Sequence, residues 1–516
     1  MSWRTNSGAW AVGVLALAAA AMWIAFARQP GLGTFADDSV SYLVMAQVFS
    51  PWHAAAAPVA AVFPLEAFHP PLFPLVLALV GASHDFSLAH GVNAVLLAAC
   101  LPLVYQVALR WLGATLPAVL ATLAVLALPA LWIHVRGILS EPLFCLLLLA
   151  IVVTLEARIG TRARLAGLAM LFAALALTRT IGLAVAMGYA LWAVTRPGAP
   201  AQRASGALPA LAALAAYAIW IAVRPAAVAD PNAGAAADRL GEVLAAPGTL
   251  AGGLARQGLA MAEAWTGSLM LFWVEGTYAR PAVAALVGVL ALAGLCLRLS
   301  RPDTWMVGVY LVTYLLWPFY DQMTRFLFPV LPLLVLYAFV PLARLAERRR
   351  RPGLPALVLF LVVLSLTAPA LGFIHQRARS ELPHAAIIDW YRTPDLATAR
   401  ARAQVHLDLA ADMDAIRRAS APGDRVMWVA PAYVALLAER HAVAAPPARL
   451  PREEYRRAVE TSGATFVYLS TYHPRDTIRE DAWRAGTAAL EGAGEVVDRR
   501  SRASPAGLAS ALLRLR

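Results

Sequence analysis

Long apolar segments alternate with short polar ones over the first 374 residues of this chain. A helix needs roughly 20 apolar residues to cross the hydrocarbon core of a bilayer. The pattern therefore predicts an α-helical polytopic membrane protein with about eleven transmembrane helices, the first of which is retained rather than removed as a signal peptide. The predicted helices lie near residues 9–26, 87–109, 115–134, 139–157, 165–178, 181–195, 207–223, 281–298, 304–318, 326–343 and 354–373.

The pattern changes after residue 374, where charged residues become frequent and the apolar runs become short. Stretches with helical spacing of their apolar residues separate three β-like runs, at 424–430, 464–470 and 495–500. Strands that alternate with helices are typical of an α/β fold. We therefore predict a transmembrane domain over residues 1–374, with a long first external loop over 27–86, and a small α/β domain over 375–516.

The charged residues of the membrane domain divide into two sets. If the N-terminus is cytoplasmic, one face of the membrane receives Arg158, Arg162, Arg164, Arg196, Arg203, Arg298, Arg301 and Arg348–Arg351. The opposite face receives Asp37, Asp38, Glu66, Asp85, Glu141, Asp230, Glu275 and Asp321. Because arginine is enriched on the cytoplasmic side of membrane proteins, we predict that the acidic face and the C-terminal domain are extracytoplasmic, on a plasma (inner) membrane.

Composition supports this assignment. The chain is 60% hydrophobic and 14% charged, with a mean hydropathy of +0.64, which excludes an ordinary soluble protein. Its net charge of +12 does not indicate nucleic-acid binding, because the arginines cluster between apolar segments. The cysteines Cys100, Cys145 and Cys296 lie in apolar runs, so we expect free thiols in a packed core.

Candidate chemistry begins with two adjacent carboxylates, Asp37 and Asp38, in the stretch FADDSVSYLVMA. Either could cap a helix that starts there, but one cap does not need two acids, and charges at a membrane edge are costly. Asp38 and Tyr42 are four residues apart, on one face of that helix. Later in the loop, His69 begins HPPLFPLVLAL, which is too short to span a membrane. We predict an interfacial helix there that directs His69 toward a membrane-surface cavity.

Three further charged residues fall on the same predicted face. Glu141 begins a predicted helix in SEPLF, where an acid stabilises the first turn. Arg179 separates two apolar segments in LTRTIGL and needs an anionic partner there. Arg325, in RFLFPVLPLL, begins the tenth predicted helix near Asp321, which could form a structural ion pair with it. Structural and functional roles stay open for Glu141 and Arg179, and a functional role is favoured for Arg325.

The motifs DDSVSYLVMAQ, FHPPLFPLVLAL, SEPLF, LTRTIGL and RFLFPVLPLL occur in this order along the chain. Together with the predicted topology, they resemble the integral-membrane glycosyltransferases of the GT-C superfamily. Within it, the chain is most similar to the bacterial branch of protein O-mannosyltransferase-like enzymes and the lipid A aminoarabinose transferase. The resemblance covers roughly residues 10–345, together with the presence of a C-terminal extracytoplasmic domain.

The resemblance implies that a sugar passes from a polyprenyl-phosphate-linked donor, held by membrane lipid, to a hydroxyl of a glycolipid, a polysaccharide or a protein. It also implies an acidic residue of the first loop as the catalytic base. The family pattern places its first acid four residues before a tyrosine, which selects Asp38 and leaves Asp37 as an extra acid. The choice between Asp37 and Asp38 therefore stays open.

The same resemblance suggests which residues bind the donor phosphate. Guanidinium groups bind phosphate bidentately, so Arg325 and Arg179 are the candidates, with Tyr42 and Glu141 in support. The aminoarabinose transferase has a lysine where this chain has His69. Histidine also binds phosphate, but its charge depends on pH.

No cofactor is required for this chemistry. A divalent cation is compatible with it, because some relatives use one, although the sequence has no His/Cys cluster that demands a metal. Two other classes of membrane protein are the alternatives to a transferase. A secondary transporter typically has two similar halves and charges at the membrane midplane, and neither is evident here. An O-antigen polymerase or ligase would centre on arginine-rich late external loops rather than on an acidic pair in the first loop.

Overall fold

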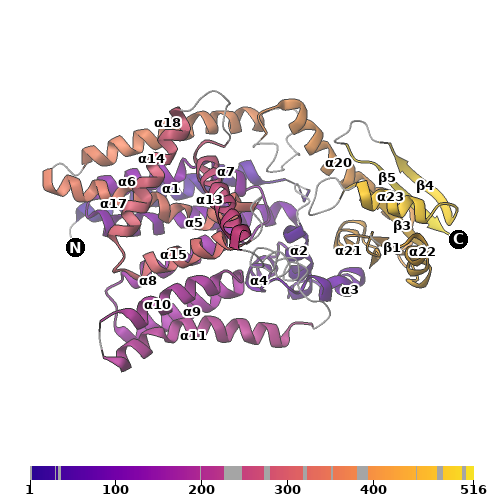
Figure 1. Ribbon diagram of the computed structural model, residues 1–516, viewed down its shortest axis with the longest axis horizontal. Helices are drawn as coiled ribbons and strands as arrows, with labels where there is room; N and C mark the ends of the chain where they lie inside the picture. Colours follow the sequence, from indigo (N-terminus) through magenta and orange to yellow (C-terminus); the bar gives the residue numbers. More distant parts are fainter. Residues whose placement is uncertain are drawn as a thin grey trace.

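The computed structural model describes residues 3–29, 31–32, 37–197, 199–225, 247–271, 279–317, 322–349, 353–379, 393–448, 450–472, 480–501 and 507–516. They form a bundle of helices followed by a small sheet (Figure 1). The bundle contains α1 (Trp3–Ala27), α5 (Phe86–Leu112), α6 (Thr115–Leu126), α7 (Pro129–His134), α8 (Glu141–Leu155), α9 (Thr161–Thr178), α10 (Gly182–Thr195), α11 (Pro200–Val223), α13 (Pro247–Met270), α14 (Ala279–Leu297), α15 (Pro302–Leu315), α16 (Met323–Leu327), the 3₁₀ helix η2 (Phe328–Val330), α17 (Leu331–Arg349) and α18 (Gly353–Ala378). Between α1 and α5, the first external loop contains α2 (Asp37–Phe49), α3 (Ala57–Glu66) and α4 (Leu72–Leu79).

Local sequence signals set the ends of these helices. The carboxylate of Asp85 accepts the backbone N–H of Leu88 at 3.0 Å and caps the start of α5. Gly113 ends α5 in the left-handed region, with φ of 71°. The segment predicted as one helix over 115–134 is two helices instead, because Pro129 has no N–H to continue the hydrogen-bond ladder of α6 and begins α7.

All eleven predicted apolar segments are helical. Among the described residues, seven helices are long and apolar enough to cross a bilayer: Gly8–Ala27, Phe86–Leu112, Thr161–Thr178, Pro200–Val223, Ala279–Leu297, Met323–Ala346 and Gly353–Ala378. The helices α6, α8, α10 and α15 have only 12, 15, 14 and 14 residues. The number of eleven spans therefore stays a prediction, whereas the helical polytopic architecture is confirmed.

Apolar side chains cover the outside of several bundle helices. The outward side chains of α18 include Leu354, Leu357, Val358 and Leu361, which are 41–56% exposed. Soluble proteins rarely expose contiguous apolar surface of this kind, whereas lipid tails cover it in a membrane. The chain is therefore a multi-pass membrane protein. Cys100 and Cys145 are buried as expected, but Cys296 is exposed, because it lies one turn after the outward-facing Leu292 of α14.

Helix α13 has no counterpart among the predicted spans. Its 24 residues include several glycines together with Arg256, Gln257 and Glu263, which lower its mean hydropathy below that of its neighbours. The helix nevertheless packs on α14, α16 and α18. The indole N–H of Trp265 donates to the carbonyl of Ala284 in α14 at 2.8 Å, which fixes the two helices together.

The C-terminal region is a mixed sheet with helices on both faces. Its strands are β1 (Arg425–Trp428), β2 (His441–Ala444), β3 (Phe466–Ser470), β4 (Gly494–Arg500) and β5 (Ser510–Leu515), in the order β2-β1-β3-β5-β4. Strands β1, β2 and β3 are parallel, and β5 runs antiparallel to β3 and β4. Its helices are α20 (Leu396–Ala419), α21 (Pro431–Tyr433), the π-helix η3 (Val434–Ala438), α22 (Arg452–Thr461) and α23 (Glu480–Ala489).

This arrangement confirms the predicted α/β fold. Leu409 of α20 shares one core with Trp428 and Tyr468, and Tyr455 of α22 shares a second core with Val467. The sequence predicted β1, β3 and β4 but not β2 and β5. Strand β2 has only four residues, and β5 follows a stretch rich in serine, alanine and glycine, so neither stands out from its surroundings.

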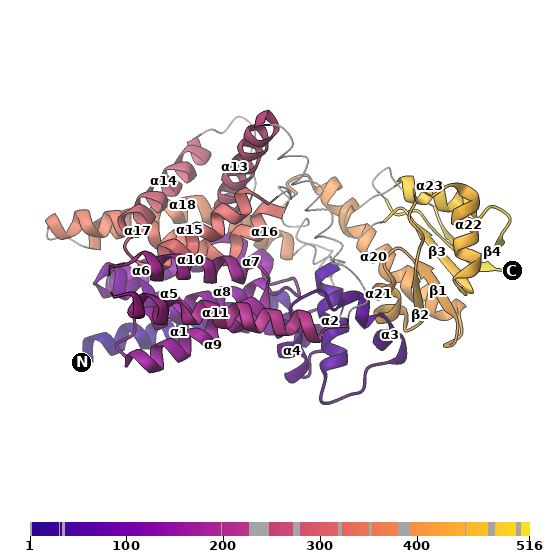
Figure 2. The same cartoon turned by 60° about the horizontal axis from the view of Figure 1, so that its bottom comes forward.

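The C-terminal sheet packs on the first external loop. Val59 and Val62 of α3 share a buried core with Tyr433 and Val434, and α3 contacts α21, η3 and β2. Both views place α2 and α3 between the bundle and the sheet (Figure 1 and Figure 2). The loop that carries Asp38 is therefore held between the two parts of the molecule.

Candidate active site

The first turn of α2 places Asp38 where three other segments meet. Its carboxylate accepts a hydrogen bond from Nη2 of Arg325, and its side chain is 21% exposed. Helix α2 is fixed by apolar packing, since Val40, Leu43 and Val44 are almost completely buried. Asp38 thus combines a charged partner on one side with access to solvent on the other.

Arg325 joins Asp38 to a second carboxylate. Its Nε donates to Oε1 of Glu141, the first residue of α8. The short helix α16 that carries Arg325 is anchored on both sides: the hydroxyl of Tyr310 donates to the carbonyl of Phe326 at 2.6 Å, and the ring of Phe328 stacks on that of His134 with centroids 4.5 Å apart. The guanidinium is therefore held in place by packing of its own helix.

Arg179 completes the cluster from a third direction. It ends α9 in an extended conformation, and its Nη1 lies 2.6 Å from Oε1 of Glu141 and 3.2 Å from the hydroxyl of Ser140. The tight connection to α10 needs Gly182, because a Cβ there would come within 2.7 Å of the backbone of Leu175. Glu141 is only 1% exposed, so two guanidinium groups compensate one fully buried carboxylate.

Tyr42 and His69 lie beside this cluster. The hydroxyl groups of Tyr42 and Ser140 are 2.8 Å apart, which ties α2 to the start of α8. Nε2 of His69 lies 3.7 Å from Oδ1 of Asp38, and the imidazole ring is 5.0 Å from the ring of Tyr42. His69 is 13% exposed and stands just before α4, the short helix predicted from the HPPLF motif.

The charges around Asp38 control its ionisation. Burial by itself would raise the pKa of this carboxyl group, but the positive charges of Arg325 and Arg179, together with that of His69 when its imidazole is protonated, outweigh burial and hold the pKa well below its ordinary value. Asp38 is therefore ionised at neutral pH, in the form that accepts a proton.

Known proteins resemble this chain in structure rather than in sequence. No protein-family model and no curated protein sequence matches it. The oligosaccharyltransferase of Archaeoglobus fulgidus, tethered with an acceptor peptide, is 12% identical and aligns with a TM-score of 0.50 over 99% of this chain and 74% of the other. The lipid A aminoarabinose transferase ArnT of Cupriavidus metallidurans in its apo state is 14% identical and aligns with a TM-score of 0.51 over 97% of both chains.

The chain shares its fold with these two proteins, which are GT-C glycosyltransferases. The resemblance inferred from the five motifs is thus confirmed for the fold. A second ArnT structure, bound to undecaprenyl phosphate, is 14% identical and aligns with a TM-score of 0.47 over 97% of both chains.

The structure brings the sequence-predicted site residues of this GT-C fold together. Asp38, Arg325, Glu141 and Arg179 form one chain of ion pairs, and Tyr42 and His69 flank it. Asp37 begins α2, but its side chain lies outside the described residues, as do Asp230, Glu275 and Asp321. The structural pair expected between Arg325 and Asp321 therefore stays a prediction.

Two further residues belong to the surroundings of the site and were not predicted. Ser140 bridges Tyr42 and Arg179, and its position directly before Glu141 in SEPLF was the available signal. Arg224 ends α11, and its Nη1 donates to the carbonyl of Phe68, next to His69, at 3.3 Å. Arg224 follows an apolar segment directly, as Arg179 does, and this shared pattern could have identified it.

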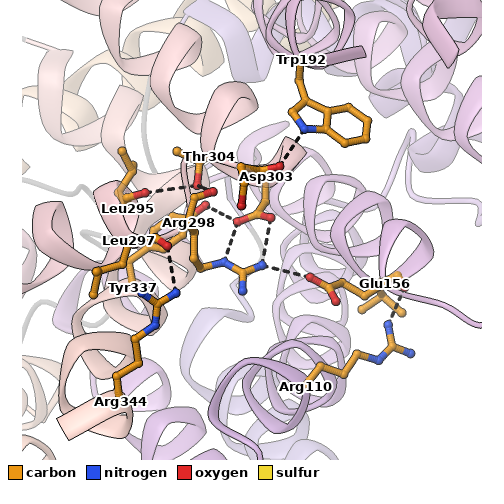
Figure 3. A network of polar contacts seen from close by, with 12 residues as sticks. Arg110, Glu156, Trp192, Leu295, Leu297, Arg298, Asp303, Thr304, Tyr337 and Arg344 are labelled. Carbon is orange, nitrogen blue, oxygen red and sulfur yellow. Dashed lines mark hydrogen bonds and ion pairs between the residues drawn. The ribbon is translucent and has the colours of Figure 1, made fainter. Parts of the chain in front are cut away.

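A second buried charge cluster lies at the other end of α8 (Figure 3). Glu156 follows α8 directly, so the 15 residues of that helix separate it from Glu141 by about 22 Å. Arg298 donates to Glu156 at 3.0 Å and to both oxygens of Asp303 at 3.0 and 3.1 Å, and the hydroxyl of Tyr337 donates to Asp303 at 2.8 Å. These contacts join the end of α8 to α14, α15 and α17.

Within the part of the chain that the structure describes, no group of three or more His, Cys, Asp or Glu residues could hold a metal ion. In the candidate site, guanidinium groups instead compensate the carboxylates. The site therefore offers one ionised acid close to solvent and two fixed cations behind it.

Proposed function

We propose that this protein transfers a sugar from a polyprenyl-phosphate-linked donor to an acceptor hydroxyl, with Asp38 as general base. The observation that carries this proposal is the Asp38–Arg325–Glu141–Arg179 cluster, in which a solvent-accessible carboxylate stands beside two guanidinium groups. The reaction needs these two functions next to each other: a proton acceptor for the attacking hydroxyl and a cationic site for the phosphate that leaves.

In the proposed reaction, the acceptor oxygen forms a bond to C1 of the sugar while the bond from C1 to the phosphate oxygen breaks. The proton of the acceptor hydroxyl passes to Asp38. The electron pair of the broken bond stays on the polyprenyl phosphate, where negative charge develops. Arg325 and Arg179 bind that phosphate, and their charges stabilise it as it leaves.

Glu141 and Tyr42 position these groups. Glu141 accepts a hydrogen bond from Arg325 and forms an ion pair with Arg179, which orients both guanidinium groups toward one point. Tyr42 connects α2 to α8 through Ser140, which sets the distance from the base to the arginines. His69 supports phosphate binding from the side of α4. None of these steps uses a cofactor, and a divalent cation at the phosphate is compatible with them.

We place the reaction at the extracytoplasmic surface of the plasma membrane. Residues 1–374 then form the catalytic membrane domain and 375–516 the extracytoplasmic domain, in agreement with the packing of the C-terminal sheet on the first loop. An acceptor on a glycolipid, a polysaccharide or a protein presents the same hydroxyl to Asp38. The transporter alternative is not favoured, since the buried carboxylates among the described bundle residues lie at the ends of helices rather than at mid-span.

Mass spectrometry of envelope glycolipids and glycoproteins tests the proposal. A deletion strain is compared with its parent and with strains that express either the intact protein or Asp38→Asn. We expect a sugar modification that disappears on deletion, returns with the intact protein and does not return with Asp38→Asn at equal membrane abundance. Identical glycolipid and glycoprotein profiles in the deletion strain and its parent would contradict the proposal.

A further inference from the structure

The charged side chains of the candidate site that the structure describes sum to zero when His69 is neutral. Within the ion-pair chain, the carboxylates of Asp38 and Glu141 balance the guanidinium groups of Arg179 and Arg325. Farther from the cluster, the negative charge of Glu66 is offset by the positive charge of Arg224. Glu66 ends α3 and accepts a hydrogen bond from Ser41, and Arg224 donates to the carbonyl of Phe68. The phenol groups of Tyr42 and Tyr314 add no charge at neutral pH, and the side chain of Asp37 lies outside the described residues.

A donor phosphate would add a negative charge to this neutral site. A sugar-linked polyprenyl phosphate is a phosphodiester and carries one negative charge throughout the neutral pH range. The two arginines are already paired with carboxylates, and their ion pairs are largely buried, with side chains 15–20% exposed for the arginines. An added buried charge without compensation is costly, so a further cation is needed when the donor binds.

His69 is placed to supply that cation. Asp38 presents Oδ2 to Arg325 and Oδ1 to Nε2 of His69, at 3.7 Å. If the donor phosphate accepts hydrogen bonds from the Arg325 guanidinium, Asp38 shares the positive charge of Arg325 with the phosphate. A protonated His69 would then supply a second positive charge beside Asp38. Histidine is the side chain whose charge ordinarily changes between about pH 5 and about pH 8, so it can respond in this way.

We infer that binding of the donor phosphate to this site takes up a proton on His69. This inference rests on the proposed function, because it takes the phosphate-linked lipid as the ligand. The protonated imidazole then acts as the third cation of the occupied site, beside Arg179 and Arg325. Donor affinity is therefore highest at low pH, where His69 is already charged. It falls as pH rises, because the proton must then be taken from solvent when the donor binds.

The test measures binding of a defined probe to the purified full-length protein in nanodiscs. The probe is the methyl ester of undecaprenyl phosphate, a phosphodiester whose single charge does not change with pH, and undecaprenol is the uncharged control. We expect the Kd to rise up to about tenfold per pH unit at the high end of a series from about pH 5.5 to about pH 8.5. Binding enthalpies in buffers of different ionisation enthalpy should report uptake of up to one proton.

Three variants separate His69 from other sources of pH dependence. His69→Lys keeps a positive charge over the whole series, so its affinity for the probe should be independent of pH. His69→Gln has no charge, so it should bind weakly at every pH, as the intact protein does at about pH 8.5. His53→Gln is the matched control, because His53 is exposed in the same loop and its ring lies against that of His84 rather than at the cluster. It should retain the pH dependence of the intact protein.

The possible outcomes distinguish the inference from the proposed function. Probe binding that does not vary with pH in the intact protein would overturn the inference alone, as would an unchanged pH dependence in His69→Gln. Failure of the folded intact protein to bind the probe at any pH would overturn both. Thermal unfolding of each variant verifies that it is folded when binding is measured.

Discussion

At the scale of single residues, Arg325 is the centre of the site. It joins Asp38 to Glu141, which are 287 and 184 residues away from it along the chain. The guanidinium group suits this position, because its several N–H donors can contact two carboxylates and a phosphate oxygen in fixed directions, which a lysine ammonium cannot do. Two residue-scale predictions test the proposed base, Asp38, separately from the proposed phosphate-binding group, Arg325.

The first prediction concerns the base. Asp38→Asn keeps the size of the side chain and an acceptor oxygen but removes the proton acceptor, so turnover should fall about 10²-fold or more. Binding of the phosphodiester probe should not weaken, since the variant removes a negative charge beside the phosphate site. Turnover is measured with labelled acceptor at equal membrane abundance.

Asp37→Asn is the matched control for this prediction, and it should lower turnover less than Asp38→Asn does. Successive residues at a helix start point about 100° apart, so both acids do not face the same attacking hydroxyl. Turnover in Asp38→Asn equal to that of the parent would contradict the assignment. A severe loss in Asp37→Asn alone would move the base one residue earlier.

The second prediction concerns the phosphate site. Arg325→Ala should weaken binding of the phosphodiester probe about tenfold or more, because a charged hydrogen-bond donor is lost. Arg325→Lys keeps the charge without the bidentate geometry and should give an intermediate Kd. Thermal unfolding accompanies both measurements. If a folded Arg325→Ala protein binds the probe as tightly as the parent, Arg325 serves only to hold Asp38 and Glu141 in place.

At the scale of elements, α8 connects two charge clusters with different roles. Its first residue, Glu141, belongs to the candidate site, and Glu156, directly after its end, belongs to the Arg298 cluster. Both clusters contain buried acids and arginines, so burial and charge do not by themselves identify an active site. The difference is position: Asp38 lies on α2 of the first external loop, whereas Glu156 and Asp303 surround Arg298 at the opposite end of α8.

The third prediction follows from this difference. Asp303→Asn leaves Arg298 with a weaker set of acceptors and should lower the free energy of unfolding by about 3–5 kcal/mol. Tyr337→Phe removes one hydrogen bond to a charged acceptor and should cost about 1.5–3 kcal/mol. Both variants should show lower Tm values with unchanged turnover per folded molecule. A loss of turnover in folded Asp303→Asn would give the Arg298 cluster a part in the reaction.

At the scale of the whole molecule, the C-terminal sheet covers the first external loop. Buried residues of α2, α3 and η3 form one core, so α2, which carries Asp38, and the C-terminal region are packed as a continuous unit. If the proposed reaction takes place at Asp38, the acceptor would lie near α21 and η3, from which the C-terminal region could select it.

The fourth prediction concerns orientation in the membrane. The arginine distribution predicts a cytoplasmic N-terminus and an extracytoplasmic C-terminus. Alkaline phosphatase fused after residue 516 should be active, and a fusion near Arg349 should report the cytoplasm. The reverse pattern would place the candidate site on the cytoplasmic face and would contradict the proposed reaction, whose site is extracytoplasmic.

The sequence by itself determined the membrane architecture and the residue types of the site. Apolar segments and β-like runs are local properties, because hydrophobicity and periodicity act within a window of a few turns. The helical bundle, the C-terminal α/β fold and the GT-C resemblance were therefore predictable. Local signals failed where composition was ambiguous, as in the glycine-rich α13 and the short strand β2.

Only the tertiary structure decided which charges meet. Sequence proximity suggested Asp321, which lies outside the described residues, as a partner of Arg325, and only the packing of the helices showed that Asp38 and Glu141 contact it. The approach of Arg224 to the segment before His69 likewise depends on how α11 packs. Such pairings are set by the positions of whole helices. These positions result from many apolar contacts between residues far apart along the chain, and no local motif contains such contacts.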